Sequence, residues 1–358
     1  MSDHVHTRSA GRTGIITLDR PKALNSLSLD MVRELTAILL DWREDPRIDA
    51  VVLTSSSERA LCAGGDIRFF HDVGRATPRG GSALIEDFFT EEYALNYLIH
   101  TYPKPYIALM DGVIMGGGMG IAQAGPQARG RVVSARTKMA MPEVNIGIFP
   151  DVGGSFFLSR AAGRLGYYLG LTGLSIGAAD AICAGLADWY VPPAQWAQLA
   201  ALIGNTPGAG LPAAIAALSE PAGDSELARQ RASIDRHFSA GSVGAIMASL
   251  ASDADSFAQQ ALAAMRQRSP LMMSVTHQLL ERGATLHIAD CLRMERNLVR
   301  RCFEHGEVIE GVRALVIDKD NTPQWNPARL DQVSTAMVER FFEPAWPAWA
   351  HPLRHLEK

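Results

Sequence analysis

Two acidic residues stand in an otherwise apolar stretch, MPEVNIGIFPDVGG, which covers residues 141–154. Glu143 follows a proline, and Asp151 comes eight residues later, directly before a valine and two glycines. A carboxylate removed from water is costly unless it is paired or takes part in chemistry. Desolvation also makes it more basic, so Glu143 could act as a general base or a nucleophile. On the residues alone, Glu143 could also be a surface acid at a strand end, and Asp151 a turn or helix-cap residue.

Two glycine-rich loops follow segments that we expect to be buried strands. LCAGGDI (61–67) comes after AVVLTSS, and VIMGGGMGIA (113–122) comes after PYIALMDG. Glycine lets the backbone approach a ligand closely and adopt a positive φ. One free N–H group from each loop could bind the same oxygen and stabilise an oxyanion. Either loop alone could equally be a tight strand-to-helix turn that needs glycine only for packing.

The second loop does not fit a dinucleotide-binding site. Gly116 and Gly118 are followed by Ile121, where the pattern G-x-G-x-x-G requires a third glycine. No acidic residue ends the next expected strand, RVVSA, about twenty positions on. A nicotinamide cofactor is therefore not expected.

Composition excludes several classes of protein. The chain has 358 residues and a net charge of −4, with no dominant basic tract, so a nucleic-acid partner is not expected. No apolar run reaches about 18 residues, and the N-terminus lacks the apolar segment of a signal peptide. Four cysteines without metal-binding spacing fit a reducing compartment, by default the cytoplasm. No metal is expected, and His4 and His6 fall in a tail that we expect to be disordered.

Alternating short strands and helices predict an α/β fold. Strands are expected at 14–19, 50–56 and 105–112, and helices after Ser28, which can cap the first of them, and at about 84–101. Beyond about residue 200, segments rich in alanine and leucine predict helices. We therefore expect a core over residues 1–200 and a mainly helical C-terminal region over 201–358 that packs on it.

Several motifs occur in the order found in the crotonase (enoyl-CoA hydratase/isomerase) superfamily, which the chain resembles over roughly residues 10–195. The resemblance implies a spiral of ββα units, an acyl-CoA thioester as substrate, and no cofactor beyond the CoA of that substrate. It also implies an oxyanion hole formed by the backbone N–H groups of Gly65 and Gly117. The motifs are ITLDRPKALNSL, LCAGGDI, KPYIALMDGVIMGGGMGIA, MPEVNIGIFPDVGG and LTGLSIGAADAICAGLAD.

One position separates this chain from the hydratases of that superfamily. Hydratases use two glutamates, and the first is replaced here by Gly120, which has no side chain to move a proton. Glu143 matches the second, and Asp151 is an addition. This combination resembles the 3-hydroxyisobutyryl-CoA hydrolase branch, as do FFTEEYALNYLI and EGVRALVIDKDNTPQW. The resemblance then extends from about residue 10 to 330.

Membership of that branch would give three acids a role. Glu143 would attack the thioester or activate water, and Asp151 would bind the 3-hydroxyl group of the substrate or position the attacking water. Glu92 lies on the apolar face of the helix expected at 84–101 and matches a substrate-contacting glutamate of the branch. A buried ion pair with an arginine is the alternative for Glu92. The phosphates of CoA could be held by Arg20, Lys22 or Arg68.

Three other functions stay open. The protein could be an enoyl-CoA hydratase or isomerase acting on another acyl-CoA, or a homologue that binds acyl-CoA without turnover. Gly173, Ser175 and Gly177 form G-x-S-x-G, which a serine hydrolase places between a strand and a helix. The preceding residues are expected to be helical, so Ser175 is expected to cap the following helix instead. Homo-oligomer formation is possible.

Overall fold

The computed structural model describes residues 3–79 and 81–357. Its contacts divide the chain into two compact units, each made of three segments. The first unit consists of Met1–Gly65, Ala94–Ala140 and Ile176–Ala228, and the second of Asp66–Tyr93, Met141–Ser175 and Arg229–Lys358. The division into a core and a C-terminal region near residue 200 was based on composition and stays a prediction.

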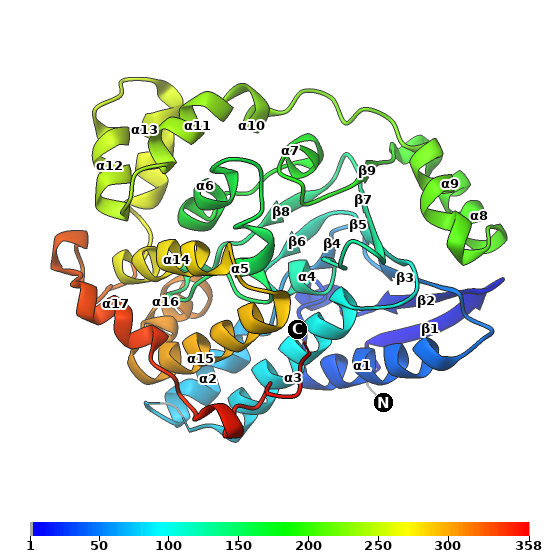
Figure 1. The fold of residues 1–358 in the computed structure, drawn as a ribbon, viewed down its shortest axis with the longest axis horizontal. Helices are drawn as coiled ribbons and strands as arrows, with labels where there is room; N and C mark the ends of the chain where they lie inside the picture. Colours follow the sequence, from blue (N-terminus) through cyan, green and yellow to red (C-terminus); the bar gives the residue numbers. More distant parts are fainter. Residues whose placement is uncertain (1–2, 80, 358) are drawn as a thin grey trace. The chain divides into compact units, whose positions relative to one another are not determined.

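The first unit contains two sheets (Figure 1). The six-stranded sheet has the order β1-β2-β3-β5-β7-β9, in which β1 and β2 are antiparallel and the other neighbours are parallel. Its strands are β1 (Val5–Ala10), β2 (Thr13–Leu18), β3 (Ala50–Ser55), β5 (Tyr106–Met110), β7 (Arg129–Val133) and β9 (Trp189–Tyr190).

The second sheet is parallel and has the order β4-β6-β8. It consists of β4 (Ala60–Cys62), β6 (Val113–Met115) and β8 (Lys138–Ala140). From β3 to β9, successive strands therefore alternate between the large and the small sheet. This alternation fits the repeated ββα arrangement that the family resemblance implies.

Local sequence signals explain the first elements. Ser28 caps helix α1 (Leu29–Glu44) by accepting a hydrogen bond from the N–H of Met31, as predicted. The prediction of a disordered N-terminal tail was wrong, because His6 lies in β1 and its ring contacts the Asp19 carboxylate at 3.1 Å. The polar outer residues of β1 hide its strand character, whereas antiparallel pairing with β2 stabilises it.

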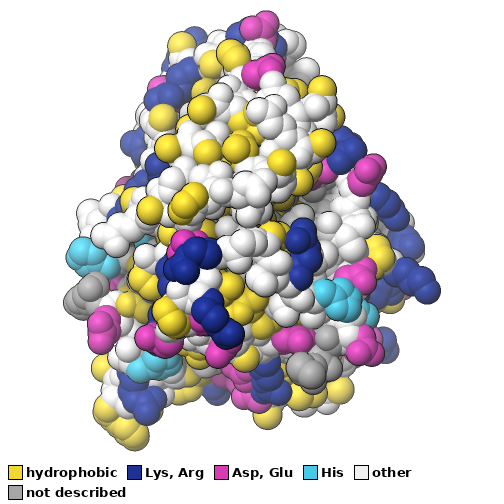
Figure 2. All heavy atoms as spheres, turned by 90° about the vertical axis from the view of Figure 1, so that its right-hand side faces the viewer, with side chains coloured by type: hydrophobic (Ala, Val, Ile, Leu, Met, Phe, Trp, Pro, Cys, Tyr) yellow, Lys and Arg dark blue, Asp and Glu magenta, His cyan; other side chains and the backbone are white. Residues whose placement is uncertain are grey.

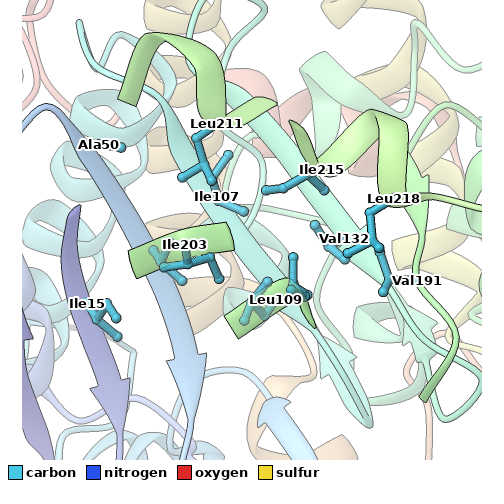
Figure 3. Packing of buried hydrophobic residues seen from close by; sticks show 12 residues of the cluster. Ile15, Ala50, Ile107, Leu109, Val132, Val191, Ile203, Leu211, Ile215 and Leu218 are labelled. Atoms are coloured by element: carbon cyan, nitrogen blue, oxygen red, sulfur yellow. The ribbon is translucent and has the colours of Figure 1, made fainter. Parts of the chain in front are cut away.

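Two helices cover one face of the large sheet (Figure 3). They are α8 (Trp196–Asn205) and α9 (Leu211–Leu218), and their apolar side chains pack on those of β2, β3, β5 and β7. The remaining helices of this unit are α4 (Gly117–Gly120) and α7 (Ala178–Cys183), together with the end of α3 and the start of α10. The buried cluster comprises Ile15, Ala50, Val52, Ile107, Leu109, Val132, Val191, Leu199, Ile203, Leu211, Ile215 and Leu218.

The second unit is built from helices. Within it, α14 packs against α5 and α6, α15 against α5 and α17, and α16 against α2. The helices are α2 (Ile67–Ala76), α3 (Ala83–His100, up to Tyr93 in this unit), α5 (Gly154–Phe157), α6 (Leu165–Thr172), α10 (Glu226–Arg229, ending here), α11 (Arg231–Phe238), α12 (Val243–Ala251), α13 (Ser256–Met265), α14 (Pro270–Gly283), α15 (Ile288–His305), α16 (Val308–Val312) and α17 (Thr335–Phe342).

The surface carries charges of both signs. Figure 2 shows one face on which basic and acidic side chains lie interspersed, in keeping with the small net charge of −4. Among the residues that the structure describes, no helix is both long and apolar enough to cross a lipid bilayer.

Candidate active site

The two glycine-rich loops lie against each other in the first unit. Their glycines follow β4 and β6, which are parallel neighbours paired at Cys62 and Ile114. A methyl group added to Gly64 would lie 3.1 Å from the Met115 oxygen and 3.5 Å from the Gly117 nitrogen. One added to Gly118 would lie 2.2 Å from the Cys62 oxygen, closer than any real contact. Glycine is therefore required for this backbone-to-backbone packing.

Backbone conformation explains two of the glycines in the same loops. Gly64 has φ +102° and Gly116 has φ +50°, both in the region that favours glycine. Within the described residues, the N–H groups of Gly65 and Gly117 donate no hydrogen bond to a protein acceptor. Gly117 is the first residue of α4, where a backbone N–H has no partner inside the helix. Both amides are thus available to an external acceptor.

Glu143 is held in a buried bend of the second unit. It begins the short 3-10 helix η2 (Glu143–Asn145), which follows Pro142, and only 6% of its surface is exposed. Its Oε2 atom is buried and has no hydrogen-bond partner among the described residues. Burial, and next the charge of Asp151, raise the pKa of Glu143 well above its usual value. The prediction that desolvation makes this acid more basic is therefore consistent with its surroundings.

Asp151 is buried in the same unit, and Tyr93 donates a 2.6 Å hydrogen bond from its hydroxyl to Oδ2 of this carboxyl group. Burial raises the pKa of Asp151 to about 6, although the Tyr93 hydrogen bond opposes the increase. Sequence reasoning did not select Tyr93. Its position next to Glu92, in a helix with a buried face, could have indicated it.

Glu92 lies inward on α3, as predicted, with 2% of its surface exposed. Its Oε1 atom has no hydrogen-bond partner among the described residues. Burial and the nearby charge of Asp151 raise its pKa well above the usual value. The alternative role in an ion pair is not seen within residues 3–79 and 81–357, where the buried Arg296 contacts Glu86 instead.

The structure thus brings Glu92, Glu143 and Asp151 together in one unit, where the charge of Asp151 helps to raise the pKa of both glutamates. In the described part of the chain, none of them forms an ion pair. The raised pKa values of Glu92 and Glu143 favour their protonated forms, in which a carboxyl group can both donate and accept hydrogen bonds. Gly65 and Gly117 belong to the other unit.

Glu295 on α15 is a fourth buried acid. Its carboxylate accepts hydrogen bonds from the N–H groups of Gly153 and Ser155, at 2.7 and 2.9 Å. It also accepts one from the Ser155 hydroxyl. Burial raises the pKa of Glu295 to about 8. Position 295 lies three residues after Leu292 and four before Val299, a spacing that could have indicated a buried acid.

The sequence matches the family model of enoyl-CoA hydratase/isomerase over residues 13–342. The chain belongs to the enoyl-CoA hydratase/isomerase family. The predicted resemblance to the crotonase superfamily and the predicted α/β fold, with its ββα spiral and helical C-terminal region, are therefore confirmed.

Relatives within this family carry names of different enzymes. A mitochondrial 3-hydroxyisobutyryl-CoA hydrolase from Xenopus tropicalis is 40% identical over 344 residues, covering 93% of this chain and 87% of that protein. Its counterpart from Danio rerio is 38% identical over 340 residues, with the same coverage. A solved structure of a carnitinyl-CoA dehydratase from Mycobacterium thermoresistibile has a TM-score of 0.89 and 40% identity, covering 97% of this chain and 98% of that one.

Two further positions bear on which member of the enoyl-CoA hydratase/isomerase family this is. Gly120, which replaces the first hydratase glutamate, is buried at the end of α4. Ser175 is exposed and follows helix α6, so the strand that a serine-hydrolase elbow needs is absent at this described position. The prediction that Ser175 caps the next helix was wrong, because the N-cap of α7 is Gly177.

The three basic residues that could hold the CoA phosphates either contact other protein atoms or face solvent. Arg20 donates to the backbone oxygen and hydroxyl of Ser26, and Arg68 donates to the backbone oxygen of Val316. Lys22 is exposed in a short 3-10 helix. A role for any of them in binding the CoA phosphates stays a prediction.

Proposed function

We propose that this protein hydrolyses the thioester of a short-chain 3-hydroxyacyl-CoA, most simply 3-hydroxyisobutyryl-CoA, to the free hydroxy acid and CoA. The observation that carries the proposal is the cluster of Glu92, Glu143 and Asp151, buried without ion pairs in the described residues. Buried polar atoms without partners are rare in folded proteins, so the free oxygens of Glu92 and Glu143 favour a polar ligand. The names of the Xenopus and Danio relatives support the same reaction.

The proposed chemistry divides between backbone and side chains. The N–H groups of Gly65 and Gly117 would stabilise the negative charge that develops on the thioester oxygen. Glu143 would either attack the carbonyl carbon, releasing CoA and leaving an anhydride for water to hydrolyse, or remove a proton from an attacking water. Asp151 and Glu92 would bind the 3-hydroxyl group of the substrate, and the two mechanisms for Glu143 stay open.

Release of free thiol tests the proposal directly. The purified protein is incubated with 3-hydroxyisobutyryl-CoA, with isobutyryl-CoA, which lacks the hydroxyl group, and with crotonyl-CoA. We expect rapid release of CoA from the first, slower release from the second, and no loss of the crotonyl double bond. Hydration of crotonyl-CoA without thiol release would refute the hydrolase. Binding of all three without turnover would indicate a non-catalytic acyl-CoA-binding protein.

A hydratase, dehydratase or isomerase is the second candidate, because the Mycobacterium structure with 40% identity is named a carnitinyl-CoA dehydratase. Addition or removal of water by the two-glutamate mechanism needs a carboxylate at position 120, where this chain has glycine. The hydrolase is therefore favoured. Glu143 and Asp151 also disfavour the silent binder, because a protein that only binds acyl-CoA has no need of buried reactive acids.

The wider setting of the enzyme is also part of the proposal. Hydrolysis of 3-hydroxyisobutyryl-CoA would be a step of valine breakdown, with no cofactor other than the CoA of the substrate and no nucleic-acid or membrane partner. Four free cysteines support a reducing compartment, proposed to be the cytoplasm, while the named relatives are mitochondrial. Light scattering would show whether the protein forms a homo-oligomer.

A further inference from the structure

Glu295 is a buried acid without a counter-ion, and it takes no part in the chemistry proposed above. It has no exposed surface and, in the described part of the chain, no ion pair. The arginine next to it in sequence, Arg296, turns instead to Glu86 and Thr90. An acid that is buried without a cation is costly to keep, so its presence calls for a specific use.

Both oxygens of Glu295 are committed to one turn of the backbone. Oε2 accepts the N–H of Gly153 at 2.7 Å, while Oε1 accepts the N–H of Ser155 at 2.9 Å and the hydroxyl of Ser155. These residues come two and four positions after Asp151. No other described side chain accepts a hydrogen bond from these two backbone N–H groups, so the turn is anchored to α15 through this one carboxyl group.

The anchored turn has an unfavourable backbone. Val152 has φ +52° and Gly153 has φ +88°. A β-branched residue rarely adopts the left-handed conformation, and such strain persists only where the surroundings hold it in place. Val152 links Asp151 to Gly153, the nearer of the two residues that Glu295 holds, so relaxation of its backbone would shift the Asp151 carboxyl group.

We propose that Glu295 is a positioning residue for the hydrolysis, which fixes the strained turn 151–155 and thereby aims the Asp151 carboxyl group at the 3-hydroxyl group of the substrate. The inference rests on the proposed function. Glu295 acts through Asp151 and touches no reacting atom. Burial also raises the pKa of Glu295, in agreement with a group kept for geometry in an apolar setting.

The test is Glu295→Gln. Glutamine keeps the size of the side chain but replaces one of the two accepting oxygens with an NH₂ group, which cannot accept from Gly153 or Ser155. A misplaced substrate-binding group can reduce the rate by about 10- to 100-fold, and we expect a loss of kcat/KM in this range with 3-hydroxyisobutyryl-CoA. With isobutyryl-CoA, which offers Asp151 no hydroxyl group, the loss should be within about threefold.

Glu307→Gln is the matched control. Glu307 is also a buried glutamate, and it likewise accepts from a serine hydroxyl, that of Ser269, and from one backbone N–H, that of Asn326. It does not hold the turn after Asp151, so kcat/KM should change by less than about twofold, the usual scale of independent sites. Thermal unfolding of both variants shows whether they lose a similar amount of stability.

A double-mutant cycle separates positioning from general support. If Glu295 acts through Asp151, Glu295→Gln should cost almost nothing further in an Asp151→Asn background. The inference would be overturned if the effects of the Glu295 and Asp151 substitutions on kcat/KM were fully additive. It would also be overturned if Glu295→Gln lost equal activity with both substrates, or if Glu307→Gln lost as much kcat/KM as Glu295→Gln. Should Glu295→Gln fail to fold, Ser155→Ala, which removes only the hydroxyl donor, should still lower kcat/KM selectively with the hydroxylated substrate. An unchanged ratio between the two substrates in that variant would also overturn it.

The outcomes for the inference and for the proposed function are distinct. If the wild-type protein releases no CoA, the proposed hydrolase is refuted, and the role of Glu295 with it. If the wild-type protein releases CoA and Glu295→Gln does so equally well from both substrates, only the role of Glu295 is refuted.

Discussion

Replacing Tyr93 with phenylalanine should move the acid limb of the pH–rate profile to higher pH. The change removes the 2.6 Å hydrogen bond to Asp151 and leaves the buried ring in place. In the native protein this bond lowers the pKa of Asp151, against the increase that burial causes, and the net pKa is about 6. Without the bond, Asp151 should bind its proton more tightly, so a higher pH is needed to ionise it.

The size of the effect follows from the strength of the bond. A hydrogen bond to a charged group contributes about 1.5–3 kcal/mol. Because 1.36 kcal/mol corresponds to a factor of ten in proton affinity, the acid limb should move by about one to two pH units. At pH 7 the ionised fraction of Asp151 would fall from about nine-tenths to between about one-half and one-tenth, so kcat/KM should fall roughly 2- to 10-fold. Near pH 9 the variant should approach the native rate.

Thiol release from 3-hydroxyisobutyryl-CoA between pH 5 and pH 9 provides the assay. Tyr102→Phe is the control, because Tyr102 is equally buried but donates its hydroxyl to the Leu39 backbone oxygen, within the other unit. That variant should keep the native profile. If the acid limb of the Tyr93→Phe profile stays in place or moves to lower pH, the ionisation of Asp151 does not determine that limb.

Three further predictions concern stability and rate. Asp151 has a raised pKa in the folded protein, so its contribution to stability is present at low pH and is lost as pH rises from about 4 to about 6. Asp151→Asn should therefore raise the free energy of unfolding at pH 7 by up to about 3 kcal/mol, while kcat/KM for the hydroxylated substrate should fall. Urea unfolding at pH 7 measures the stability, and a variant that is no more stable than the native protein would contradict the prediction. Glu143→Ala should abolish turnover and leave circular dichroism unchanged; a native kcat would remove Glu143 from the mechanism. Gly118→Ala should lower the melting temperature and the rate together, because its methyl group would lie 2.2 Å from the Cys62 oxygen, and native values of both would mean that the loops can separate.

The sequence predicted the elements whose pattern is local. Ser28 and the apolar spacing after it define α1, and the unbroken apolar run at 50–53 defines β3. The sequence indicated each member of the cluster separately. Glu143 and Asp151 stand in family motifs, and Glu92 lies on the apolar face of a helix. The N-terminal strand was missed since Val5 is its only buried residue, and pairing with a neighbouring strand stabilises it.

Contacts between distant segments could not be predicted in the same way. Tyr93 and Asp151 are 58 positions apart, and Glu295 is 142 positions from Gly153. The spacing around Glu295 indicates a buried residue, but nothing local indicates which backbone N–H groups it accepts. The left-handed Val152 was equally unpredictable, because valine disfavours that conformation and only the surrounding contacts impose it.

The long separation between Glu295 and its turn has a consequence for synthesis on the ribosome. Gly153 emerges 142 residues before the side chain that will hold it. At about 5–20 residues per second, this amounts to a delay of roughly 7–30 s. During that interval the nascent chain carries a valine whose preferred backbone conformation differs from its final one. The turn that Glu295 holds should therefore form only after most of the chain has been synthesised.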